Sequence, residues 1–129
     1  MMTAMQGLHL TADLRDCASC RGPLFTDPAA LRACCLTAVR AAGLEPVGEL
    51  FHRFADGAGV TGVVLLAESH LAVHTWPELA AVTLDVYVCN FSGDNSERAR
   101  RLLDDLQRSF EPGSVDRQML QRGRQPHLA

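Results

Sequence analysis

The sequence predicts an α+β protein, a two-layer sandwich in which two helices cover one face of a mainly antiparallel sheet. Three observations lead to this fold class. Six segments have strand character, and short turns rich in Gly and Pro separate many of them. Only two segments have the spacing of an amphipathic helix. A chain of 129 residues without an internal repeat or linker is typical of a single domain.

Strand segments are recognised by alternation or by short apolar runs. Gly7–Leu14 alternates from the start, and Val60–Ala67 is apolar on both faces, as expected of a central strand. The next strand stops at Pro77. Ala81–Cys89 again alternates, with four apolar side chains on one face. The expected strands are Gly7–Leu14, Glu45–Phe54, Val60–Ala67, Leu71–Trp76, Ala81–Cys89 and Ser114–Gln121.

The two helices have recognisable ends. Asp27 is a good N-cap and Pro28 suits the first helical position, so the first helix should run over Pro28–Ala42 and end at Gly43. The segment 93–96 offers cap residues for the second helix. Its apolar stripe consists of Ala99, Leu102, Leu103, Leu106 and Phe110.

Composition excludes several classes of protein. The chain is 47% hydrophobic with a formal charge of −3, which favours a folded core and gives no electrostatic reason to bind nucleic acid or an anionic membrane. No apolar run approaches the roughly 20 residues that span a bilayer. The first residues lack the pattern of a secretion signal, and an odd count of five cysteines favours reduced thiols, so we expect a cytoplasmic protein.

Two of the cysteines, Cys17 and Cys20, have CxxC spacing. This spacing occurs in redox pairs and in halves of zinc sites. The second half of a zinc site is not evident, and Cys34 and Cys35 are adjacent on the first helix and therefore point apart. The four thiols are more simply interpreted as buried or half-buried core residues.

The second face of the expected sheet is mixed in character. It carries Asp85, Tyr87 and Cys89 from one strand, with His70, His74 and Trp76 from its neighbour if the alternation holds. Such a face is too polar for a core, and both helices are needed on the other side. Faces of this kind usually contact a ligand, a partner subunit or both.

The stretch 67–78, AESHLAVHTWPE, allows several interpretations. His70 and His74 could bind a metal on a helix, but Pro77 and the neighbouring residues favour a strand, where the two lie two pleats apart. Ser69, His74 and Asp85 could form a hydrolytic triad, although the Gly-x-Ser-x-Gly elbow is missing. The purely structural alternative is a pair of hydrogen-bonded histidines in a dimer interface.

One family accounts for these residues together. The segment GVVLLAESHLAVHTWPE followed by LDVYVC resembles the prokaryotic S-adenosylmethionine decarboxylase proenzymes, whose hallmark is an ESHxxxHTWPE block followed by a DVxxC strand. The resemblance extends to the GxHLxADLxxC start, to FHRF at 51–54 and to QRGR near the end, and so covers most of the chain.

The resemblance implies that the chain cuts itself between Glu68 and Ser69. The Ser69 hydroxyl would attack the Glu68 carbonyl and form an ester, and β-elimination followed by hydrolysis would leave a pyruvoyl group on an α chain of residues 69–129. The β chain would comprise residues 1–68. This step needs a hydroxyl held near its own amide, which a turn or bulge with local strain at 68–70 would provide. By resemblance, His74 and the hydroxyl of Thr61, where the family usually has serine, assist processing.

The resemblance also assigns the residues of turnover. The pyruvoyl ketone forms a Schiff base with the substrate amine and acts as the electron sink, with no metal and no pyridoxal phosphate. Cys89 would return a proton to the substrate carbon. Phe54 would stack on the adenine or lie near the sulfonium, Glu78 would accept hydrogen bonds from the ribose, and Trp76 would help to build the pocket wall.

Some positions depart from the family pattern. The usual Gly-Arg-His near the start is Gly7-Leu8-His9, the usual Thr-Cys-Gly is Val88-Cys89-Asn90, and the loop after Phe54 is one residue longer. The resemblance therefore implies a decarboxylase acting on S-adenosylmethionine for spermidine synthesis. Two alternatives stay open, an arginine or ornithine decarboxylase with the same machinery and an unprocessed homologue with a binding or regulatory role.

We further expect a homodimer whose sites draw on both chains. No helix remains to cover the second face of the sheet, and a cleft that buries a nucleoside needs a cover. The resemblance implies the same arrangement, with Phe54 and Glu78 on the opposite side of the interface from part of the chemistry.

Overall fold

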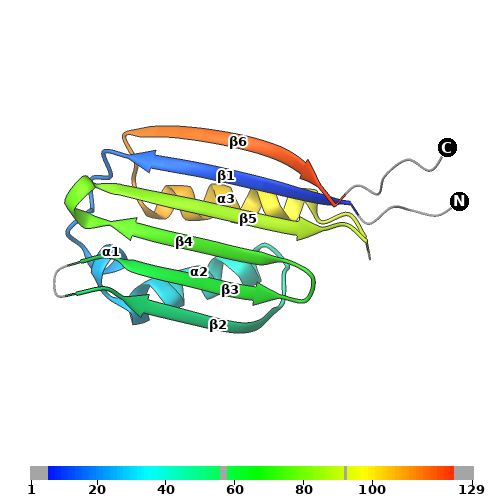
Figure 1. Ribbon diagram of the computed structural model, residues 1–129, viewed down its shortest axis with the longest axis horizontal. Coiled ribbons are helices and arrows are strands. Elements are labelled where there is room, and N and C mark those ends of the chain that lie inside the picture. Colours follow the sequence, from blue (N-terminus) through cyan, green and yellow to red (C-terminus); the bar gives the residue numbers. More distant parts are fainter. Residues whose placement is uncertain (1–5, 56–57, 92, 124–129) are drawn as a thin grey trace, which may run out of the picture.

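The computed structural model describes residues 6–55, 58–91 and 93–123, and these form a six-stranded antiparallel sheet with helices on one face (Figure 1). The strand order is β2-β3-β4-β5-β1-β6, so the first strand of the chain lies between the last two. The fold class predicted from the sequence is confirmed. The strands are β1 (Gly7–Arg15), β2 (Pro46–Arg53), β3 (Val60–Leu66), β4 (His70–Trp76), β5 (Ala81–Cys89) and β6 (Ser114–Arg122).

Two long helices, α2 (Pro28–Ala41) and α3 (Ser96–Ser109), lie behind the sheet in Figure 1. The Asp27 carboxylate caps α2 by accepting a hydrogen bond from the Ala29 amide at 3.0 Å. The structure adds a short helix, α1 (Pro23–Thr26), and a 3₁₀ turn, η1 (Pro77–Leu79). The expectation of two helices was incomplete because four residues are too few to show a helical period.

The core fills the space between the helices and one face of the sheet. The inward side chains of β5 are at most 2% exposed, and the apolar stripe of α3 is fully buried. One polar group lies in this layer. The Thr75 hydroxyl donates to the Phe25 carbonyl and accepts from the Val60 amide, both at 2.8 Å, so its burial costs no unpaired group. The predicted strand bounds agree with the structure to within one residue.

The opposite face of the sheet, which we call the open face, is covered by no helix among the described residues (Figure 1). Cross-strand pairing places Leu65, His70, Tyr87, His9 and Leu120 in one row across it. Leu65 is 50% exposed and Leu120 is 58% exposed. Large apolar side chains in such positions are typical of a surface that meets a partner.

Candidate active site

The bond between Glu68 and Ser69 lies in the tight turn that joins β3 to β4. The Leu66 amide donates to the Ser69 carbonyl at 2.9 Å, and the Ser69 amide donates back to the Leu66 carbonyl at 3.4 Å. The expected break between the strands is therefore present, which removes Ser69 from the alternation of β4. The expected local strain is not visible in the dihedral angles, because no residue from 66 to 70 has a positive φ.

Ser69 is held against the end of β5. Its hydroxyl oxygen accepts a hydrogen bond from the Cys89 amide at 3.2 Å, although the two residues are 20 positions apart. Cys89 is only 5% exposed, whereas Ser69 is half-buried and Glu68 is exposed. A hollow of about 460 Å³ beside them is lined by Glu68, Tyr87, Cys89 and Phe91. The reacting hydroxyl, the bond to be cut and the proposed acid thus belong to one small region.

A cluster of rings lies on the open face next to this region. The Tyr87 ring centroid is 5.7 Å from that of His70 and 6.0 Å from that of His9. His9 Nε2 is 2.5 Å from an Asp85 carboxylate oxygen, and the Arg122 guanidinium lies 5.5 Å from the Tyr87 ring centroid. The sequence analysis did not assign His9 and Arg122 to the site. The alternation of β1 could have placed His9 there, but Arg122 required the pairing of β1 with β6.

The predicted processing residues Thr61 and His74 form a pair of their own. They are opposite each other on β3 and β4, and the Thr61 hydroxyl lies 3.1 Å from His74 Nδ1. This pair is remote from the cleavage turn. His74 follows Ser69 by five residues along an extended strand, which corresponds to about 16 Å. Neither side chain spans that distance within one chain.

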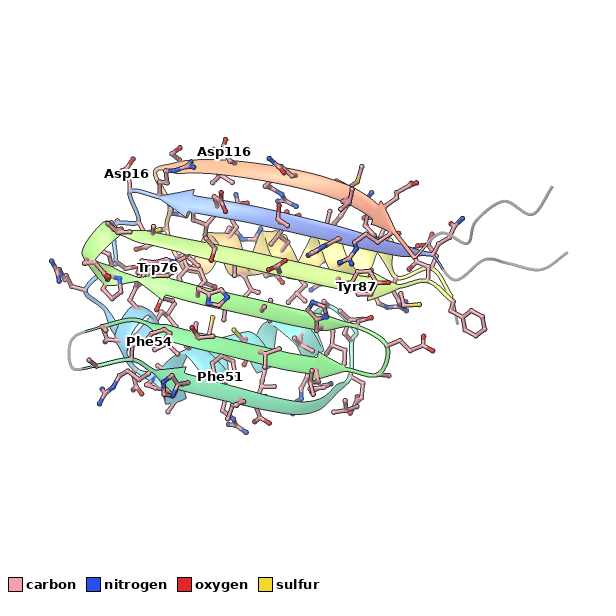
Figure 2. All side chains as sticks on the ribbon, in the orientation of Figure 1. Asp16, Phe51, Phe54, Trp76, Tyr87 and Asp116 are labelled. Carbon is pink, nitrogen blue, oxygen red and sulfur yellow. The ribbon has the colours of Figure 1, made fainter. Side chains whose placement is uncertain are left out.

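The proposed substrate-binding residues lie at the same end as Thr61 and His74. Figure 2 shows Phe54 and Trp76 toward one end of the sheet and Tyr87 toward the other. Phe54 is 49% exposed and packs edge-on against His52 at a centroid distance of 5.3 Å. Trp76 is 39% exposed and contributes to a hollow of about 290 Å³, while Glu78 is exposed on η1.

The predicted site residues therefore fall into two groups at opposite ends of the open face. We call the first group the cleavage end; it comprises Glu68, Ser69 and Cys89. We call the second group the aromatic end; it comprises Phe54, Thr61, His74, Trp76 and Glu78.

Comparison with known proteins identifies the family. The sequence model of the S-adenosylmethionine decarboxylase family matches residues 8–123. The chain belongs to the S-adenosylmethionine decarboxylase family. It is 38% identical over 122 residues to the S-adenosylmethionine decarboxylase proenzyme of Aquifex aeolicus, covering 95% of this chain and 84% of that protein.

Two further relatives agree with this assignment. The proenzyme of Hydrogenobaculum sp. is 37% identical over 122 residues, covering 95% of this chain and 85% of that protein. The crystal structure of the adenosylmethionine decarboxylase from Aquifex aeolicus superposes with a TM-score of 0.82 at 32% identity, covering 98% of both chains. The resemblance predicted from the ESHxxxHTWPE block is confirmed, and with it membership of an enzyme family.

Of the remaining thiols, Cys17 and Cys35 lie in the hydrophobic core, and Cys20 and Cys34 pack against it. Burial raises the pKa of the Cys17 and Cys35 thiols above the ordinary value. Cys17, Cys20, Cys34, Cys35 and Cys89 are free cysteines. In the described part of the chain, no group of three or more His, Cys, Asp or Glu side chains is arranged to hold a metal ion. None of the described helices has the length and apolar character needed to cross a membrane.

Proposed function

We propose that this chain is a single-domain S-adenosylmethionine decarboxylase proenzyme that cuts itself between Glu68 and Ser69 and supplies the aminopropyl donor for spermidine synthesis. The observation that carries the proposal is the Ser69 hydroxyl, held by the Cys89 amide within a tight turn. The names of the relatives support S-adenosylmethionine as substrate. No observation on the chain favours arginine or ornithine. A cytoplasmic location stays a prediction.

The turn supplies what the first step needs. The hairpin restrains the backbone at Ser69, and the Cys89 amide holds its hydroxyl, so that attack on the preceding carbonyl is an intramolecular reaction with little entropy left to lose. Attack breaks the Glu68–Ser69 amide and forms an ester from the same two residues. The hydrogen bond from Cys89 N–H reduces the electron density of the ester oxygen that leaves in the elimination. Each part of this step comes from the cleavage end.

The residues at the cleavage end fit a pyruvoyl group derived from Ser69. Such a ketone accepts the substrate amine and withdraws electrons as carbon dioxide leaves. The hollow lined by Tyr87 and Phe91 gives the reacting atoms a partly apolar setting. The Cys89 thiol, 5% exposed, is placed to hold a proton close by and return it to the substrate carbon.

The separation of the two ends supports a site shared between two chains. The hollow at the cleavage end is open on one side. At the other end, the aromatic side chains are exposed to solvent in the single chain. If two open faces pack against each other around a two-fold axis that runs across the strands near their midpoints, the cleavage end of each chain meets the aromatic end of the other. This homodimer places Thr61 and His74 of one chain beside Ser69 of the other, where they assist processing as a proton-transfer pair.

The same packing gives the aromatic end its role in binding. Phe54 and Trp76 offer exposed ring faces, which stack on an adenine and attract a sulfonium cation. Glu78 is exposed beside them and accepts hydrogen bonds from ribose hydroxyls. The substrate thus extends from the rings of one chain to the Ser69-derived group of its partner.

Intact mass spectrometry of the purified protein tests the proposal. We expect two fragments divided between Glu68 and Ser69, with an α chain that has no free amine. Carbon dioxide release should then be observed with S-adenosylmethionine and not with arginine or ornithine. Decarboxylation of arginine or ornithine would show that the proposed substrate is wrong, while the proposed self-cleavage and pyruvoyl chemistry would still stand. An uncut chain that binds a ligand without turnover would establish the non-catalytic alternative.

A further inference from the structure

The backbone of Cys89 is held by two side chains. Its N–H donates to the Ser69 hydroxyl at 3.2 Å, and its carbonyl accepts from the Asn95 side-chain amide at 3.1 Å. The N–H and C=O of one strand residue point to the same side, here toward β4. The last pair between β4 and β5 is His70 with Tyr87, so β4 has already ended at this level. Ser69 and Asn95 therefore replace the missing strand as partners of Cys89.

Asn95 is itself firmly placed. Its backbone N–H donates to the Asn90 side chain at 2.8 Å, and Asn90 also donates to the Ser96 hydroxyl at 3.2 Å. The Asn95 carbonyl accepts from the Ala99 amide at 3.0 Å, which begins α3. Its side-chain oxygen accepts from Arg98 at 3.0 Å. The side-chain N–H that reaches Cys89 is thus fixed by a helix end and by Asn90, the residue that stands where the family usually has glycine.

The two contacts have different fates in the proposed maturation. Cleavage followed by elimination removes the Ser69 hydroxyl oxygen, so Cys89 loses one of its two side-chain partners. The Asn95 contact persists, because it involves neither the Glu68–Ser69 peptide bond nor the Ser69 hydroxyl. β1 pairs with the other edge of Cys89 throughout. On the β4 side, Ser69 and Asn95 both hold Cys89 before processing, and Asn95 is the partner that remains afterwards.

We propose that Asn95, braced by Asn90, is a positioning residue that keeps the Cys89 thiol in place for turnover after maturation has removed the Ser69 hydroxyl. This inference deepens the proposed function and rests on it. The contribution is specific to the processed enzyme, because the Ser69 contact supports Cys89 in the precursor. Asn95 touches no reacting atom and acts only through Cys89.

Thiol labelling in an uncut background tests the contact without any cofactor. Ser69→Ala imitates the loss of the hydroxyl. Asn95→Asp then replaces the N–H donor by an oxygen of similar size, while the acceptor for Arg98 and the backbone carbonyl that begins α3 are kept. We expect iodoacetamide to modify Cys89 faster in the double variant than in Ser69→Ala by roughly two- to tenfold, the factor that one hydrogen bond typically carries. Arg101→Ala in the same background, at an exposed position of the same helix that pairs with Asp105, is the matched control and should leave the rate unchanged. Labelling at Cys35, which is fully buried in the core, reports any general opening of the fold.

Equal Cys89 labelling in Ser69→Ala and in Ser69→Ala/Asn95→Asp would overturn the proposal. So would faster labelling that occurs equally at Cys35, because that pattern indicates general destabilisation. These outcomes do not depend on decarboxylation and leave the proposed function standing. The proposed function fails separately, if the wild-type chain is not cut at Glu68–Ser69.

The processed enzyme offers a second readout. With a displaced thiol, the proton would be added at the Ser69-derived carbon and not at the substrate carbon. Water would then split the C=N bond, which leaves the substrate nitrogen on the α chain as an N-terminal alanine and releases the decarboxylated substrate as an aldehyde. Asn95→Asp should be cut normally yet accumulate this free amino terminus several-fold faster per product formed than wild type, detected by amine labelling of the α chain. Arg101→Ala should resemble wild type. An unchanged ratio in Asn95→Asp would contradict the positioning role.

Discussion

The cleavage end and the aromatic end of the open face are built in different ways. At the cleavage end, a hairpin turn and the buried Cys89 fix the reacting groups by hydrogen bonds within one chain. At the aromatic end, Phe54 and Trp76 are 49% and 39% exposed and have no cover among the described residues. The first end contains the bond and the nucleophile of the proposed self-cleavage, whereas the second contains exposed rings and the Thr61–His74 pair that we propose transfers a proton.

This difference is the reason for proposing that the unit of function is larger than one chain. His74 lies five residue steps after Ser69 along extended chain, about 16 Å, and no side chain bridges that gap. In the proposed two-fold dimer, the cleavage end of each chain would lie beside the aromatic end of its partner, so that two complete sites would form. The proposed dimer would also cover apolar side chains such as Leu50 and Leu65, which are 70% and 50% exposed in the single chain.

The largest effect should come from removing the nucleophile of the cleavage end. Ser69→Ala leaves no hydroxyl to attack the Glu68 carbonyl, so the chain should stay intact on a denaturing gel and show no decarboxylase activity. Ser114→Ala, at the start of β6, is the matched control and should be cut as wild type. Cleavage at the same bond in Ser69→Ala would disprove self-processing by this residue.

A second variant separates processing from turnover within the cleavage end. Cys89→Ala keeps the backbone N–H that holds Ser69 and should still be cut. Its kcat should fall by about 10²–10⁴-fold, the usual contribution of a positioned acid. Gel analysis and a carbon dioxide release assay on the same preparation give both quantities. Wild-type kcat in fully processed Cys89→Ala would exclude the thiol from proton transfer.

Variants at the aromatic end should slow cleavage at the opposite end. We expect His74→Ala to reduce the processing rate by about 10²-fold or more. Thr61→Val, which removes the hydroxyl that contacts His74, should reduce it by roughly two- to tenfold. Thr61→Ser restores the hydroxyl and should be cut at nearly the wild-type rate. The time course of the uncut chain after synthesis measures all three, and normal cleavage in His74→Ala would limit the aromatic end to substrate binding.

The smallest effect concerns a thiol with no part in either end. Burial raises the pKa of Cys35, so the folded state favours the protonated thiol. Its contribution to the free energy of unfolding is complete below the unfolded thiol pKa of about 8.5 and is lost as the pH rises above that value. Urea unfolding from pH 7 to pH 10 should show this decline in wild type. Cys35→Ala should be less stable at pH 7 and show a weaker decline, and an identical decline would assign it to other groups.

Local patterns in the sequence predicted most of the fold, and they failed where the signal was not local. Alternation in 81–89 and the caps at Asp27 and in 93–96 located β5, α2 and α3, because each depends on neighbouring residues. Helix α1 was missed, since its four residues show no period. The site residues were recognised by motif, but the motif runs continuously through 68–78 and conceals that Ser69 and His74 lie at opposite ends of the sheet. The contact of Asn95 with Cys89 depends on where β4 ends relative to β5, which no single segment reveals.

Co-expression of two inactive chains tests the shared site most directly. Cys89→Ala impairs the cleavage end and Phe54→Ala the aromatic end, and separate affinity tags allow mixed dimers to be purified. In a mixed dimer, one of the two sites combines the intact cleavage end of the Phe54→Ala chain with the intact aromatic end of the Cys89→Ala chain. We predict that mixed dimers recover about half of the wild-type activity, as one intact site in two requires. Mixed dimers no more active than either parent, or a fully active monomer in sedimentation, would contradict the account.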